Sequence, residues 1–141
     1  MFNLYHSDRI KAWKEFRDQL EVSQNPHQDV AEFWALAPFV NSYLDPQNPS
    51  SWPDPWKLIL EGRYDNLAIV LGMLYTLKLT TRFMDTPYEI HMSMPADEKD
   101  RNFFLVMDHS DVLNFEYRRS LKLNDIVEIK SKILCNGITL P

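Results

Sequence analysis

The fold is decided by residues 52–79, WPDPWKLILEGRYDNLAIVLGMLYTLKL, in which a proline-rich loop leads into two helices. An Asp-Pro pair at 54–55 is typical of a helix start, and Gly62 is typical of the residue just past a helix end. These signals predict a short helix over 55–61. A second helix follows, which the side chain of Asp65 can cap. Apolar residues surround its axis, and this predicts a helix buried inside the domain.

Two residue types in this stretch raise structural questions. Gly72 stands inside the second helix, where glycine costs roughly 1 kcal/mol relative to alanine, so we expect it to allow another backbone to come close. Trp52 and Trp56 flank the start of the first helix. We expect at least one indole to pin the proline-rich loop 45–56 onto the core, and stacking of the pair on a ligand is the alternative.

The sequence before this stretch predicts two amphipathic helices. Ser7 or Asp8 can cap the first, whose apolar positions fall on one stripe. An Asn-Pro pair at 25–26 ends it. Pro26 can then begin the second helix, which Pro38 breaks or kinks.

After residue 79 the spacing of the apolar residues changes from the helical period to the two-residue alternation of a strand. The predicted strands are 88–94, 103–107, 112–117 and 126–134, with a hairpin at 109–111 and a final turn at Asn136-Gly137. Helices first and strands after them indicate an α+β fold: N-terminal helices and a buried central helix packed on an antiparallel sheet of about four to five strands. We predict a single domain over 1–141, helical in 1–79 and sheet in 80–141.

Composition narrows the classes of function. The chain has 141 residues, 45% of them hydrophobic, which suffices for a sizeable core, and its net charge of -5 has the wrong sign for general nucleic-acid binding. Basic residues nevertheless outnumber acidic ones from Arg118 onward, so this segment is either a face for anions or acidic partners or an ordinary solvated sheet face. The basic residues are Arg118, Arg119, Lys122, Lys130 and Lys132, against Asp125 and Glu128.

Several kinds of site and location are not expected. No signal-like run is visible, and the longest apolar run, 67–77, falls short of the roughly 20 residues of a membrane-spanning helix. The single cysteine, Cys135, excludes an internal disulfide and fits a reducing compartment, so we expect a cytoplasmic or virion protein. The histidines share no metal-ligand spacing, and three glycines do not make a phosphate loop. We therefore expect no metal and no cofactor.

Residues 62–79 resemble the nucleophile helix of the transglutaminase-like branch of the papain-like cysteine hydrolases. In that family a Gly-x-Cys-Asp-like turn opens a buried helix, and a sheet brings a histidine and an acid to the thiol. The helix start favours a thiolate, the imidazole takes the thiol proton, and the acid orients the imidazole. The resemblance covers about 51–116.

The resemblance places Tyr64 at the position of the family's cysteine, Asn102 at that of the histidine and Glu116 at that of the acid. A phenol ordinarily titrates near 10, and an asparagine cannot act as a general base. The resemblance therefore implies a degenerate, non-catalytic member of the family, a pseudoenzyme.

The resulting hypothesis is a protein-binding or assembly module whose partners are other protein chains. Its candidate surfaces are the exposed aromatics at Trp52 and Trp56, the former cleft, and the basic residues Arg118 and Arg119. The WPDPW segment and the small size are also similar to phage-encoded proteins of this branch, which suggests a virion structural (neck or tail) or accessory protein. Two alternatives stay open: a cysteine-type hydrolase or transferase that uses Cys135 or His109 in a rearranged site, and a host-directed inhibitor that holds a peptide in the degenerate cleft.

Overall fold

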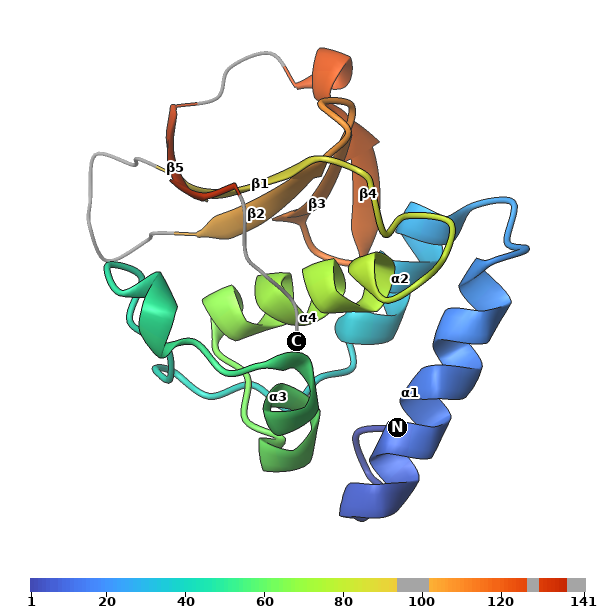
Figure 1. The fold of residues 1–141 in the computed structure, drawn as a ribbon. Coiled ribbons are helices and arrows are strands. Elements are labelled where there is room, and N and C mark those ends of the chain that lie inside the picture. The colour runs from blue at the N-terminus through green and yellow to red at the C-terminus, as the bar shows by residue number, and fades with distance from the viewer. Residues whose placement is uncertain (94–101, 127–129, 137–141) are drawn as a thin grey trace.

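A buried helix, α4 (Asn66–Lys78), packs on an antiparallel sheet and also contacts the other helices in the computed structural model (Figure 1). The structure describes residues 1–93, 102–126 and 130–136. All residues from Leu67 to Leu77 except the half-buried Ile69 are buried, as predicted. Since α4 contacts both layers, its first turn is where helices and sheet can bring side chains together.

Local signals set the ends of α3 (Pro55–Glu61) and the start of α4. The Asp54 side chain accepts a hydrogen bond from the amide of Lys57 at 2.9 Å. Gly62 follows α3 with a φ of 67°, a conformation that glycine adopts without the penalty of a Cβ atom. Asp65 caps α4 through the amide of Ala68 at 2.8 Å. All these boundary predictions are confirmed.

The first two helices are α1 (His6–Leu20) and α2 (Pro26–Trp34). The prediction that Ser7 or Asp8 caps α1 is wrong, because the helix already begins at His6 and its N-cap, Tyr5, makes no side-chain cap bond. Pro26 begins α2 as predicted. A short 3₁₀ helix, η1 (Pro49–Ser51), lies in the proline-rich loop.

The sheet of the described residues has five strands in the order β4-β3-β2-β1-β5, and every neighbouring pair is antiparallel. The strands are β1 (Tyr88–Ser93), β2 (Phe103–Met107), β3 (Asp111–Glu116), β4 (Arg119–Lys122) and β5 (Ser131–Cys135). The predicted α+β class and strand number are confirmed. A second 3₁₀ helix, η3 (Leu123–Asp125), follows β4. The sequence did not predict β4, and residues 127–129 and 137 of the predicted last strand and turn lie outside the described residues.

The two faces of the sheet are covered differently. The face toward α4 belongs to the main core, which includes Ile90, Leu105 and Leu113. On the other face, Phe104, Val106 and Val112 form a second buried cluster against Leu123 and Ile126. The segment after β4 therefore covers the face that the helices leave open. No helix of the described chain has the length and apolarity needed to span a bilayer.

A three-helix hydrogen-bond hub joins α1, α2 and α4 inside the core. The indole N–H groups of Trp13 and Trp34 both donate to the Thr76 hydroxyl oxygen, at 3.0 and 2.9 Å, and that hydroxyl donates to the carbonyl of Gly72 at 2.6 Å. All three side chains are fully buried. Gly72 makes room for the Trp34 ring, so the prediction that it admits a backbone is wrong.

Candidate functional site

Tyr64 lies just before α4, and its side chain belongs to the core. It is fully buried, its ring contacts those of Phe2 and Trp34 edge-on, and its hydroxyl donates to the carbonyl of Leu58 at 3.2 Å. Burial raises the pKa of the Tyr64 phenol to about 12, against a smaller opposing effect of Arg9. A phenol in this position is neutral at physiological pH and is not presented to a ligand.

The next residue, Asp65, holds the preceding loop on the start of α4. Besides capping the helix, its carboxylate accepts hydrogen bonds from the amides of Tyr43 and Leu44, both at 2.9 Å. The amide of Val40 also donates to the carbonyl of Tyr64 at 3.0 Å. Asp65 therefore serves as a structural anchor.

Two asparagines meet at the first residue of β2. Asn66, in the first turn of α4, accepts a hydrogen bond from the amide of Phe103 through Oδ1 at 2.8 Å. Asn114, on β3, donates through Nδ2 to the carbonyl of the same residue at 2.9 Å. Asn114 has a φ of 67°, and the register of β3 against β4 shifts between Leu113 and Glu116. The strand β3 is therefore irregular at Asn114, and such an irregularity redirects side chains.

The asparagines belong to a pocket of about 400 Å³ between α2, α4 and the end of β3. Its wall is mostly apolar, and Arg118 is its single charged lining residue among those described. Tyr117 closes one side, where its hydroxyl donates to the carbonyl of Ala35 at 3.1 Å. The full lining comprises Ala31, Trp34, Ala35, Ala37, Phe39, Asn66, Ile69, Met73, Asn114, Tyr117 and Arg118.

The sequence matches no family model and no curated protein. A solved structure, the calcium-bound form of Legionella pneumophila LapG, superimposes with a TM-score of 0.67 over 88% of this chain and 72% of LapG. The fold is transglutaminase-like. The two sequences are 15% identical, so the likeness to LapG shows the fold alone.

The three predicted positions Tyr64, Asn102 and Glu116 have different partners in the structure. Asn102 is exposed, and its backbone closes the β1–β2 pair through Ser93. Glu116 is half exposed and pairs with Arg119 at 3.1 Å. Among the described residues no hydrogen bond or ion pair joins any two of Tyr64, Asn102 and Glu116. Their equivalence to the family's catalytic positions stays a prediction, while Asn66 and Asn114 are the polar side chains that meet at the start of α4.

Neither asparagine is among the site residues that the sequence predicts. Asn66 falls in the predicted helix, and its contact with Phe103 joins residues 37 positions apart. Asn114 carried a usable signal, because asparagine interrupts an apolar strand there and is among the residues that tolerate a positive φ.

The predicted binding residues differ in their surroundings. Trp52 is only 9% exposed and donates to the carbonyl of Asp45 at 2.8 Å, so it pins the loop as expected and is not the exposed aromatic we predicted. Trp56 is 39% exposed and contacts Trp13 edge-on. Arg118 is exposed at the pocket, whereas Arg119 is neutralised by Glu116.

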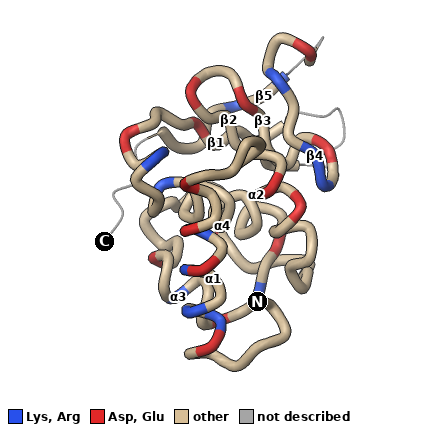
Figure 2. Tube along the Cα trace, turned by 90° about the vertical axis from the view of Figure 1, so that its right-hand side faces the viewer, with Lys and Arg blue, Asp and Glu red and all other residues tan. Residues whose placement is uncertain are grey.

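The predicted basic face is interrupted by acids. Figure 2 shows basic and acidic positions side by side around β4. Lys122 binds Asp111 at 2.6 Å in the same way that Arg119 binds Glu116. The solvated sheet face is therefore the better description of this segment apart from Arg118.

The residues of the rearranged-site alternative lie apart from this pocket. The His109 side chain is 73% exposed, and its Nδ1 lies 3.6 Å from Glu89. Cys135 is half-buried on β5, opposite Ile90. Among the residues that the structure describes, no three His, Cys, Asp or Glu side chains are grouped as a metal site.

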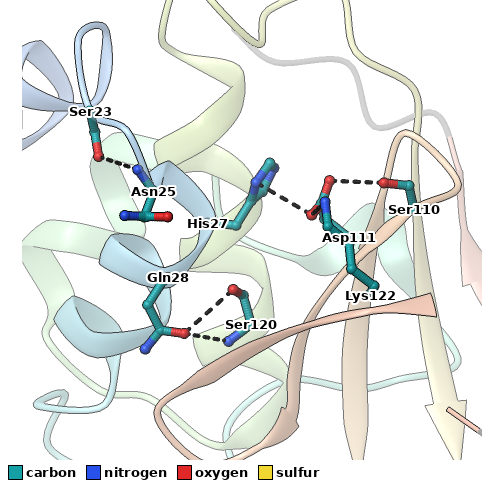
Figure 3. Close-up of polar contacts among 8 residues, drawn as sticks. All are labelled: Ser23, Asn25, His27, Gln28, Ser110, Asp111, Ser120 and Lys122. Atoms are coloured by element: carbon teal, nitrogen blue, oxygen red, sulfur yellow. Dashed lines mark hydrogen bonds and ion pairs between the residues drawn. The ribbon is translucent and has the colours of Figure 1, made fainter. Parts of the chain in front are cut away.

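A polar cluster connects α2 to the β3–β4 edge (Figure 3). His27 Nδ1 lies 3.7 Å from Asp111 Oδ1, and Gln28 accepts a hydrogen bond from the amide of Ser120 at 2.9 Å. Burial works to raise the pKa of Asp111, but Lys122, His27 and Ser110 together hold it below its usual value. Burial lowers the pKa of His27 in spite of Asp111.

The His27 environment predicts a pH-dependent stability. Its pKa is lowered on folding, so its contribution is fully present above the unfolded pKa of about 6.5 and is lost as the pH falls below it. We expect the free energy of unfolding to decrease between pH 7.5 and 5, with His27 contributing at most about 1.4 kcal/mol per pH unit. Urea titrations across this range should show a smaller decrease for His27→Gln.

His91 adds to the same slope, since burial lowers its pKa too, so His27→Gln should reduce the slope without abolishing it. His6→Gln, at an exposed position, is the control for loss of an imidazole. An identical slope in wild type and His27→Gln would contradict this account.

Proposed function

We propose that the protein is a non-catalytic binding module that holds a segment of another protein in the pocket at the start of α4. The observation that carries the proposal is the meeting of two neutral amides, Asn66 and Asn114, at Phe103. The transglutaminase-like fold supports a cleft at this helix start, and the groups found there are suited to hydrogen bonding.

The chemistry of the lining supports binding over turnover. Acyl transfer needs a nucleophile, a base within hydrogen-bond reach and an orienting group. The pocket formed by the described residues is lined by no serine, threonine, cysteine, histidine or carboxylate. Tyr64 lies in the core with its pKa raised, and its hydroxyl is bonded to Leu58. Carboxamides do not ionise near neutral pH and do not act as general acids or bases, so they can orient a ligand without reacting with it.

An assembly role is the broader setting of this proposal. The partners would be other protein chains, and a virion structural or accessory role is the form that the phage-like WPDPW segment suggests. The virion role is supported only by the similarity of the WPDPW segment to phage-encoded proteins. The pocket proposal is independent of it, because it rests on the groups around Asn66 and Asn114.

The absence of turnover is directly testable. The purified protein, incubated with fluorogenic peptides and with amine acceptors, should neither cleave nor transamidate them. Cys135 should react with an iodoacetamide probe no faster than free cysteine, because its side chain is half-buried. Turnover that disappears in Cys135→Ser would overturn the proposal in favour of the rearranged enzyme.

Binding at the pocket is tested separately by NMR. A pool of linear and cyclic peptides of varied sequence should shift the amide signals of Asn66, Asn114 and Arg118. Ala35→Tyr narrows the pocket and should remove these shifts, whereas Leu36→Tyr, at a neighbouring position that is 68% exposed, should keep them. A pool that shifts no pocket signal would overturn the proposal.

A further inference from the structure

Each pocket asparagine retains one unused hydrogen-bonding group. Asn66 uses Oδ1 for Phe103, so its Nδ2 donor has no partner in the described chain. Asn114 uses Nδ2, so its Oδ1 acceptor has none either among the described residues. Both residues line the pocket. The pocket therefore offers one donor and one acceptor from neighbouring elements.

Arg118 adds a fixed positive charge. Its backbone has a φ of 63°, and its carbonyl accepts a hydrogen bond from Gln28 Nε2 at 2.8 Å, so the residue is held at the β3–β4 turn by α2. In the described part of the structure its guanidinium has no carboxylate partner, while the neighbouring Arg119 has Glu116. No acid lines the pocket within the described residues, although the chain as a whole has a net charge of -5.

The remaining wall is apolar. Ile69 and Met73 come from α4, and Ala31 and Trp34 come from α2. A volume of about 400 Å³ lies within the roughly 300–1,000 Å³ of ligand pockets. A complementary ligand combines an apolar group, a carboxylate and an N–H donor in a small space.

We infer that the pocket binds the C-terminal residue of a peptide whose last side chain is apolar, an inference that rests on the proposed function. Arg118 binds the terminal carboxylate, with Asn66 Nδ2 as a second donor. Asn114 Oδ1 accepts the N–H of the last residue. The apolar side chain lies against Ile69 and Met73. A free carboxylic acid lacks the N–H group, and a phosphate lacks the apolar side chain.

The test uses the full chain and three probes, of which the second changes only the carboxylate and the third lacks the N–H group together with the acetyl-alanyl part. They are N-acetyl-Ala-Leu with a free carboxylate, its C-terminal amide, and 4-methylpentanoate. NMR titration should show the free peptide binding at Asn66, Asn114 and Arg118. Amidation should weaken binding by about tenfold or more, because it removes a charge-assisted hydrogen bond, and removal of the N–H group should also weaken it.

Arg118→Gln should weaken binding of the free peptide by about tenfold and abolish its advantage over the amide. Arg63→Gln is the matched control: Arg63 is exposed and lies outside the pocket, with its guanidinium 4.9 Å above the Tyr43 ring. Equal binding of free peptide and amide, or equal losses in the two variants, would overturn the inference. If pool peptides still shift the pocket signals in that case, the proposed function stands. If no peptide shifts them, both are overturned.

Discussion

Thr76→Val should lower the free energy of unfolding by about 2 to 6 kcal/mol, although the two side chains have nearly the same volume. The Thr76 hydroxyl is the acceptor for the indole N–H groups of both Trp13 and Trp34. Valine leaves two fully buried donors without a partner, and each such group costs about 1–3 kcal/mol. Urea unfolding followed by tryptophan fluorescence measures the difference.

Thr76→Ser is the matched control for this prediction. It keeps the hydroxyl and removes one methyl group, which costs roughly 1 kcal/mol. The valine variant should therefore be clearly less stable than the serine variant. Equal stabilities would mean that the indole hydrogen bonds contribute little and that the helices are held by apolar contacts alone.

The three-helix hydrogen-bond hub could not be predicted from the sequence, whereas the helix ends could. The bounds of α3 and α4 were predictable because Asp54, Gly62 and Asp65 act on amides within a few residues of themselves. The partners of Thr76 lie 63 and 42 positions away. The helical periodicity predicts that these side chains are buried, but it does not say which of them share a hydrogen bond.

The candidate site was only partly predictable for a related reason. The resemblance directed attention to the start of α4, which is where the pocket lies. It placed the third polar position at Glu116, on a regular strand. In the structure Asn114 bonds to Phe103 at the irregularity of β3, and Glu116 pairs with Arg119. Because an irregular strand does not keep the alternation of an ideal one, its sequence does not say which side chain lies toward Phe103.

The strand β4 was missed because its signal is weak and its support is distant. It spans only four residues, and α2 holds it through Gln28, which accepts from the amide of Ser120 and donates to the carbonyl of Arg118. One glutamine thus pairs backbone groups on this edge of the sheet. A contact across some 90 positions has no local counterpart in the sequence.

Gly72→Ala should destabilise the protein by about 2 kcal/mol, even though alanine is the better helix former. A Cβ atom at this position would overlap Cη2 of Trp34 and would lie 2.5 Å from Cζ2. The ring cannot withdraw freely, because its N–H is bonded to Thr76 and it makes T-shaped contacts with Phe2 and Tyr64. Overpacking of about 3 kcal/mol then exceeds the gain of about 1 kcal/mol in helix propensity.

A double-mutant cycle with Trp34→Phe identifies the cause of this loss. The three atoms nearest to the added Cβ all belong to the fused benzene ring at the outer end of the indole. The side chain of phenylalanine is shorter and has no fused second ring. In the Trp34→Phe background, Gly72→Ala should therefore cost much less, or even stabilise the helix, giving a coupling energy of about 2 kcal/mol. Urea unfolding of the four proteins measures it. A cost of Gly72→Ala that is the same in both backgrounds would show that the glycine serves the α4 backbone itself and not the Trp34 ring.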